Sequence, residues 1–282
     1  MRHDLSLLRG AQRLALRAAV SALAAWALTF GTARPAQAEF EIQEADIEKG
    51  EVQLSYRGAV HWGLPGGQEE PLLVQSHELE AQYGLTNWWL FSLTLGTEQP
   101  EGEDFGVNAI EFEAQHQFIK RDGDGIALAV QGGYEKAINH GSEQHADELG
   151  FGPIVELASG NLLVTLNPLF TAQVGDDRQT DGLGFQYGWR AEYDFTKHWG
   201  IGAEMFGEIE DLANAGSFDD QNHSIGPTLF YNSGGGDNGN GNDDKKVGKP
   251  PEMEFSLNAG LQFGLTDATS DTALKFQGEL SF

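Results

Sequence analysis

Apolar and polar residues alternate with a period of two along most of the chain after residue 50. The stretch 110–118 reads Ile-Glu-Phe-Glu-Ala-Gln-His-Gln-Phe, so one parity is mostly apolar and the other is polar. Successive side chains of a strand point to opposite faces, whereas a helix would place Glu111 and Phe112 only about 100° apart around its axis. The alternation therefore predicts β-strands that each carry one apolar and one polar face.

Twelve segments carry this alternation, and the connectors between most of them alternate in length. We predict strands at 51–62, 73–84, 88–97, 107–119, 125–136, 148–158, 161–173, 185–195, 199–209, 222–231, 253–265 and 272–282. Short turns such as 85–87 and 196–198 are followed by longer polar loops such as 98–106 and 210–221. An even strand number with short turns at one end and long loops at the other is typical of outer-membrane barrels. We therefore predict an all-β fold, a transmembrane antiparallel up-and-down β-barrel of about twelve strands.

A soluble β-sandwich would use the same alternation with its apolar side turned inward, so further features must decide between the two. Aromatic side chains stand at the segment ends, where amphipathic rings favour the membrane–water interface: Trp62, Tyr83, Trp88, Trp89, Tyr134, Phe195, Trp199 and Tyr231. The last segment places Phe276, Leu280 and Phe282 in one alternating row at the end of the chain. Both features favour the barrel.

Two features interrupt the strand pattern. Pro153, Pro168 and Pro227 each remove one N–H from a β-ladder, which predicts bulges or strand ends at these positions. Residues 232–252 are rich in Gly, Asn and Asp and hold too few apolar residues to pack, so they predict a flexible insert.

The N-terminus has the layout of a secretory signal peptide. Arginines precede and enter an apolar stretch from Leu14 to Phe30, and Ala36-Gln37-Ala38 gives the small-residue pattern of a cleavage site. The stretch is short for a transmembrane anchor and contains Arg17. We expect a signal peptide at 1–38, cleaved after Ala38, and a barrel at 39–282.

Composition excludes several classes of protein. The chain has 17 basic and 43 acidic residues, a net charge of -26; residues 1–38 hold five Arg and one Asp, so the mature chain carries -30. Such a chain is a poor match for nucleic acid, whose phosphates require clustered Lys and Arg. Cysteine is absent, which excludes disulfides, thiol nucleophiles and Cys-based metal sites. A mean hydropathy of -0.37 argues against a bundle of membrane-spanning helices.

The polar parity of the strands is predicted to line the lumen. The candidate lumen-lining residues are Arg57, Glu78, Glu80, Glu111, Glu113, Arg190, Glu192, Asp194, Glu204, Lys275 and Glu279. Carboxylates crowded in a dry interior would repel one another, which indicates a hydrated lumen or an ion-pair ladder around the few cations. Such carboxylates would favour cations in a pore. Alternatively, they keep a narrow barrel wet without selecting a solute.

Catalytic, metal and cofactor sites are not predicted. His223 and Ser224 are neighbours on a predicted strand and point to opposite faces, so they do not form a catalytic pair. His140, Glu143, His145 and Asp147 share one loop, which we interpret as a solvated polar loop and not as a metal site.

Short motifs strengthen the case for a membrane barrel. The unit Tyr83-Gly84-Leu85-Thr86-Asn87-Trp88-Trp89 looks like the strand–turn–strand unit of transporter-type barrels, and Gly264-Leu265-Thr266-Asp267 before the last strand is similar. The row Phe276, Leu280 and Phe282 resembles the C-terminal signal of Gram-negative outer-membrane barrels. More loosely, the chain resembles the outer-membrane family associated with the meta-pathway of phenol degradation.

The resemblance to these barrels implies partners and an activity. The expected partners are outer-membrane lipid, the barrel-assembly machinery that reads the C-terminal strand, and small solutes. The expected activity is that of an outer-membrane pore or transporter for cations or for small neutral or aromatic molecules. The alternatives are a plugged structural or adhesion-type envelope barrel and a soluble periplasmic sandwich that binds a ligand. The sequence leaves the substrate and the oligomeric state open.

Overall fold

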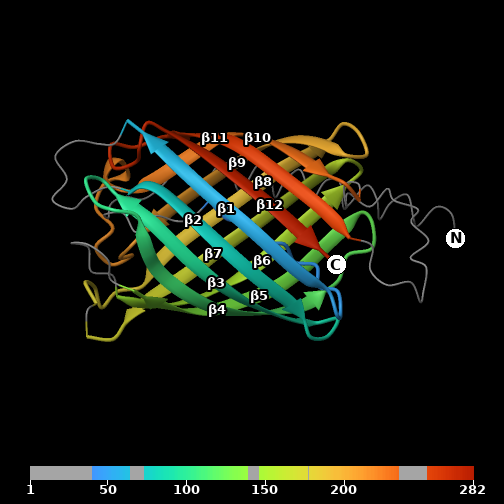
Figure 1. Cartoon of the computed structure of the whole chain (residues 1–282), viewed down its shortest axis with the longest axis horizontal. Helices are drawn as coiled ribbons and strands as arrows, with labels where there is room; N and C mark the ends of the chain where they lie inside the picture. The colour runs from blue at the N-terminus through green and yellow to red at the C-terminus, as the bar shows by residue number, and fades with distance from the viewer. Residues whose placement is uncertain (1–39, 64–72, 139–145, 177, 235–252) are drawn as a thin grey trace, which may run out of the picture.

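The chain folds into one closed antiparallel barrel in a computed structural model that describes residues 40–63, 73–138, 146–176, 178–234 and 253–282 (Figure 1). Its strands are β1 (Val52–Trp62), β2 (Leu73–Gly84), β3 (Trp89–Pro100), β4 (Gly106–Ile119), β5 (Gly125–Ala137), β6 (Asp147–Ser159), β7 (Leu162–Val174), β8 (Gly184–Asp194), β9 (Trp199–Ile209), β10 (Asn222–Asn232), β11 (Glu254–Gly264) and β12 (Thr272–Ser281). A short 3-10 turn, η1 (Phe218–Asp220), precedes β10. Each strand pairs with its neighbours in sequence, and β12 pairs with β1 to close the barrel.

The predicted fold class is confirmed. Every predicted strand is present with its bounds within one residue, except that β3 continues to Pro100 where the prediction ended at 97. The soluble-sandwich alternative is wrong, because the sheet closes on itself. The predicted signal peptide at 1–38 and most of the predicted insert, residues 235–252, lie outside the described residues.

Pro153, Pro168 and Pro227 lie inside β6, β7 and β10, so the bulges or strand ends predicted at these positions are not present there. Paired residues on both sides of Pro153, Pro168 and Pro227 keep a single register, and ladder pairs are missing only close to the prolines. Gly152 and Gly226 each stand immediately before a proline, where an added Cβ would collide with a carbonyl oxygen of the neighbouring strand. The strands therefore accommodate the prolines by close backbone approach and keep their register.

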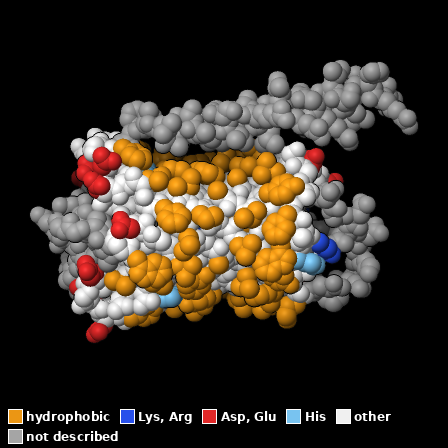
Figure 2. Space-filling model, turned by 90° about the horizontal axis from the view of Figure 1, so that it is seen from above, with side chains coloured by type: hydrophobic (Ala, Val, Ile, Leu, Met, Phe, Trp, Pro, Cys, Tyr) orange, Lys and Arg blue, Asp and Glu red, His pale blue; other side chains and the backbone are white. Residues whose placement is uncertain are grey.

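The outer wall of the barrel is apolar. Leu79, Leu93 and Phe112 project from the neighbouring strands β2, β3 and β4 and are 58%, 56% and 52% exposed. Figure 2 shows hydrophobic side chains spread over the wall, with acidic side chains gathered toward one end of the barrel. Soluble monomers rarely expose apolar patches larger than a few hundred Å². A barrel with a lipid-facing wall explains this surface, because the apolar parity of each strand then faces hydrocarbon.

Candidate functional site

Residues 40–48, hereafter the N-terminal segment, lie inside the barrel. Phe40 packs against His61 near the loop end of β1 and against Phe206 of β9, with ring centroids 5.7 and 5.2 Å apart. At the other end, the Lys120 Nζ in the short β4–β5 turn donates to the carbonyl of Ile47 at 3.0 Å. The segment therefore runs through the lumen from the end with the long loops to the end with the short turns. Gly50, with φ of +86°, then turns the chain into β1.

Buried side chains of the barrel bind the main chain of the segment. The Asn167 amide pairs with both groups of Gln43: its Oδ1 accepts from the Gln43 N–H at 2.6 Å, and its Nδ2 donates to the Gln43 carbonyl at 3.0 Å. The Ala45 N–H donates to Glu156 Oε1 at 2.7 Å. These contacts replace the ladder partners that a strand in a sheet would have, since the segment is not itself part of the sheet.

Further main-chain contacts continue along the segment. Gln115 Nε2 of β4 donates to the carbonyl of Glu44 at 2.9 Å. Together with the Lys120 bond, five hydrogen bonds join barrel side chains to main-chain atoms of the segment. Because β4, β6 and β7 all contribute, the segment is held within the lumen and does not lie on an outer face.

The apolar side chains of the segment pack against small residues of the wall. Ala45 forms a buried cluster with Ala127, Ala129 and Ile154. A Cβ added at Gly188 of β8 would lie 2.8 Å from Ile42 Cδ1 and 3.1 Å from the carbonyl oxygen of Glu41. The wall is therefore shaped to leave space for the segment.

Three carboxylates of the segment form ion pairs with three cations of the barrel. Glu41 pairs with Arg57 of β1. Glu44 pairs with Arg190 of β8 at 3.1 Å, and Asp46 pairs with Lys120 at 3.0 Å. Of the two arrangements expected from the sequence, the structure shows an ion-pair ladder at these positions, and the segment supplies one side of it.

Arg57 gathers several of the predicted lumen residues. Its guanidinium pairs with Glu78 and, at 2.9 Å, with Glu80, both on β2. The Ser55 hydroxyl donates to Glu80 at 3.2 Å. One arginine thus balances two barrel carboxylates as well as Glu41 of the segment.

A second group surrounds Glu204 of β9. Its carboxylate accepts from Arg190 at 3.0 Å, from Lys275 of β12 at 2.6 Å and from the Thr228 hydroxyl at 2.7 Å. Arg190 lies over the Phe230 ring, and the Lys275 Nζ lies 5.2 Å from the Phe206 centroid. All three charged side chains are buried, so each depends on the others for compensation.

The other predicted lumen residues lie near these two groups. Glu113 accepts a long bond of 3.4 Å from Ser92, and Glu111 faces Thr94 and Glu135 across its two ladders. Glu192 lies 3.9 Å from Arg190. Asp194 is buried at the end of β8, and Glu279 is partly buried on β12.

The predicted assembly residues lie along the seam that closes the barrel. Phe276 packs against the rings of Tyr56 and His77 at 5.9 and 6.1 Å. Leu280 is paired with Leu54 across the seam. Phe282 exchanges two main-chain hydrogen bonds with Val52. The row therefore ends where the first and last strands meet.

Sequence reasoning missed the N-terminal segment: it included residues 39–50 in the barrel domain but assigned them neither a strand nor a site. The signal in the sequence is a short run in which Phe40, Ile42, Ala45 and Ile47 are separated by acidic or amide residues, directly before Lys49-Gly50. This run is too short and irregular to distinguish from a solvated N-terminal tail.

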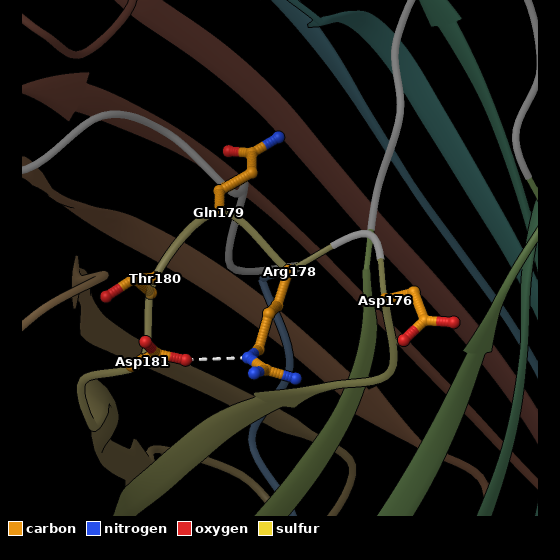
Figure 3. A pocket seen from close by; sticks show the side chains of 5 residues that line it. All are labelled: Asp176, Arg178, Gln179, Thr180 and Asp181. Atoms are coloured by element: carbon orange, nitrogen blue, oxygen red, sulfur yellow. Dashed lines mark hydrogen bonds and ion pairs between the residues drawn. The ribbon is translucent and has the colours of Figure 1, made fainter.

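A surface depression in the β7–β8 loop is a weaker candidate site. Figure 3 shows it lined by Asp176, Arg178, Gln179, Thr180 and Asp181. Arg178 Nε pairs with Asp181 at 2.6 Å, and both side chains are exposed to solvent, where such pairs contribute little. Within the described part of the chain, no group of three or more His, Asp or Glu is arranged to hold a metal ion.

Comparisons with known proteins support the barrel fold. No family model matches the chain, and no curated protein matches it. An outer membrane channel from Pseudomonas putida F1 is similar in structure, with a TM-score of 0.55 and 10% identity over 89% of this chain and 100% of that one. The KdgM porin in complex with disordered oligogalacturonate matches with a TM-score of 0.46 and 11% identity, over 82% of this chain and 98% of that one. The Acinetobacter baumannii outer membrane protein Omp33 matches with a TM-score of 0.41 and 11% identity, over 85% of this chain and 99% of that one. The similarity to the Pseudomonas putida channel confirms the resemblance to outer-membrane barrels in fold, and the looser resemblance to the phenol-degradation family is not confirmed.

Proposed function

We propose that the chain is an outer-membrane pore for small solutes and that its N-terminal segment closes the lumen in the state described. The observation that carries the proposal is the passage of residues 40–48 through the lumen from one end to the other. The apolar outer wall and the predicted export signal support an outer-membrane location. The fold shared with the Pseudomonas putida channel is consistent with a pore.

The contacts that hold the segment are of a kind that permits release. Among the described residues, the contacts that bind it include five hydrogen bonds to its main chain and three ion pairs. The three bonds from Asn167 and Gln115 each contribute a net of about 0.5–1.5 kcal/mol, and the two that involve the charged Glu156 and Lys120 each contribute about 1.5–3 kcal/mol, because water replaces them when the partners separate. The closed state therefore depends on many modest contacts, and release of the segment would hydrate the lumen.

The open lumen is proposed to favour cations, with small neutral or aromatic molecules as the second class of solute. Glu111 and Glu113 lie on the same face of β4, and neither forms an ion pair among the described residues. Rings or rows of carboxylates select cations at close quarters. The proposed partners are the outer-membrane lipid and the assembly machinery, the latter through Phe276, Leu280 and Phe282.

Planar-bilayer recordings test the pore. We expect steady conductance from a variant in which residues 39–48 are deleted, and a closed or much smaller conductance from the full mature chain. A variant with 40–48 replaced by Gly and Ser of equal length controls for chain length and should also conduct. If the deleted variant is folded, as shown by heat-modifiable gel migration, and does not conduct, the alternative of a structural envelope barrel without transport is favoured.

Selectivity is measured in the deleted variant. The double substitution Glu111→Gln and Glu113→Gln is expected to shift the reversal potential toward lower cation preference. An unchanged reversal potential would remove these two carboxylates from the selection of solute.

A further inference from the structure

The polar side chains around the N-terminal segment recognise features that any extended peptide has. We propose that the lumen is a binding track for extended peptides with acidic side chains, and that such peptides are the solute class which the open pore takes up. The N-terminal segment is then an internal occupant of the track. The proposal rests on the proposed function, since a peptide in solution reaches the track only when the segment has left it.

The track binds main-chain groups on successive residues. Asn167 binds the N–H and the carbonyl of Gln43, Gln115 binds the carbonyl of Glu44, and Glu156 binds the N–H of Ala45. All three barrel side chains are more than nine-tenths buried with the segment in place, so its main chain fills the site that they form. None of these bonds involves a side chain of the segment, so they are available to other sequences.

The donor and acceptor pattern of the track points to a peptide. Glu156 and the Asn167 Oδ1 both accept hydrogen bonds, and in the closed state they receive main-chain N–H groups. Gln115 and the Asn167 Nδ2 donate hydrogen bonds, which carbonyl oxygens of the segment accept. A small carboxylate ion offers acceptors alone and cannot supply the N–H groups that Glu156 and the Asn167 Oδ1 accept. The main chain of a peptide offers both N–H donors and carbonyl acceptors on successive residues, as the track requires.

Side-chain contacts give the track a preference for acidic peptides with a small central residue. Arg190 and Lys120 pair with Glu44 and Asp46, the residues on either side of Ala45. Ala45 itself is fully buried against alanine side chains and Ile154 and leaves no space for a large substituent. The preferred pattern is therefore an acidic residue, a small residue and a second acidic residue in extended conformation.

Binding in trans to the barrel lacking 39–48 tests this proposal. The probe is a fluorescent peptide with the sequence of residues 40–48, and fluorescence anisotropy in detergent reports binding independently of conduction. N-methylation at the positions of Gln43 and Ala45 keeps every side chain and charge but removes two N–H donors. We expect it to weaken binding about tenfold or more. N-methylation at the position of Glu44, whose N–H makes no hydrogen bond among the described residues, is the control and should weaken binding much less.

A matched pair of barrel variants locates the site. Asn167→Ala should weaken peptide binding about tenfold, because it removes two hydrogen bonds. Asn258→Ala is the control, since Asn258 is also on a barrel strand but bonds to Gln277 and not to the segment. Binding with Asn258→Ala should be unchanged. Both variants are checked for heat-modifiable migration so that loss of fold is not read as loss of binding.

The outcomes separate this proposal from the proposed function. If the deleted barrel conducts and the peptide neither binds nor blocks the current, the peptide track is wrong and the pore stands. If the peptide binds but the barrel does not conduct, the track stands as a site within a structural barrel and the pore is wrong. Equal binding by both N-methylated peptides, or competition by citrate at equal carboxylate concentration, would show recognition of charge alone and overturn the proposal.

Discussion

The buried carboxylate of Glu204 is expected to control the stability of the barrel. Glu204 is 0% exposed and Lys275 is 2% exposed, and their ion pair is 2.6 Å long. Glu204→Gln keeps the size of the side chain but leaves Lys275 without the carboxylate that balances it. Removing one partner of a buried ion pair costs about 3–5 kcal/mol, because the other charge stays buried and uncompensated. Since Arg190 retains Glu44 and Glu192 nearby, we expect the lower end, about 3 kcal/mol.

Urea unfolding in lipid vesicles, followed by tryptophan fluorescence, measures this free energy. A double-mutant cycle with Lys275→Met gives a second test. In the Glu204→Gln background the lysine is an unpaired charge, so its replacement should recover about 2 kcal/mol or more. Glu192→Gln is the matched control, because Glu192 lies 3.9 Å from Arg190 and Glu204 remains in place. Its expected cost is below about 1 kcal/mol.

A loss of less than about 1 kcal/mol for Glu204→Gln would refute the reasoning. So would a double variant whose loss equals the sum of the two single losses. Either result would mean that water reaches Lys275 and compensates its charge, and that the lumen around β9 and β12 is hydrated and not packed.

Three further predictions concern the closed state, a loop and the lipid-facing wall. Gly188→Ala should displace the N-terminal segment and raise the conductance of the full mature chain, whereas Gly150→Ala, whose Cβ would meet Leu169 at an ordinary 3.4 Å, should leave it unchanged. Hydrogen bonds from the Asn214 side chain and the Ala213 N–H lower the pKa of Asp211 below its ordinary value of 3.8. The order they give to the β9–β10 loop is therefore present above that value and lost as the pH falls through the lowered pKa. Hydrogen exchange of the loop should report this loss, and Asp211→Asn should remove its pH dependence. Leu93→Arg places a charge on the outer wall and should destabilise the barrel in vesicles by about 2–4 kcal/mol near the membrane midplane, clearly more than Leu93→Gln; equal losses would argue against lipid contact at this position.

The strands were predictable because their two faces meet different surroundings. In β4, Phe112 faces outward and is 52% exposed, while Gln115 and Gln117 face inward and are buried. A one-residue shift in register would exchange these faces. The pairing is therefore specified by the local sequence of each strand. Each strand pairs with the next one along the chain, so its neighbours follow from the order of the strands; the exception is the pairing of β1 with β12 that closes the barrel.

The prolines show where local reasoning about strands fails. Pro153 and Pro227 were expected to cause bulges or strand ends, since each lacks an N–H. The preceding glycines, Gly152 and Gly226, instead let the facing strand approach so closely that a Cβ would collide with its carbonyl oxygen. That close approach is a contact between two strands, and a single strand's sequence does not reveal it.

The N-terminal segment could not be predicted because its partners are distant in sequence and carry no periodic pattern. Asn167 and Gln43 are separated by 124 positions, and Arg190 and Glu44 by 146. Arg190 was predicted to line the lumen and Asn167 lies within a predicted strand, but nothing in the segment's own sequence selects either residue as its partner. The candidate lumen residues could thus be predicted one by one, but the N-terminal segment that contacts them could not.

The acidity of the chain affects how the N-terminal segment is held in the lumen. The segment carries carboxylates into a lumen whose walls also carry carboxylates, so repulsion opposes its insertion. Arg57, Arg190 and Lys120 offset that repulsion at three successive levels of the segment. Each of these cations contacts a different carboxylate of the segment, and Arg57 and Arg190 also balance the barrel carboxylates Glu80 and Glu204. A lumen with a few well-placed cations among its carboxylates is therefore suited to hold the acidic N-terminal segment, whereas an apolar lumen would leave the charges of the segment uncompensated.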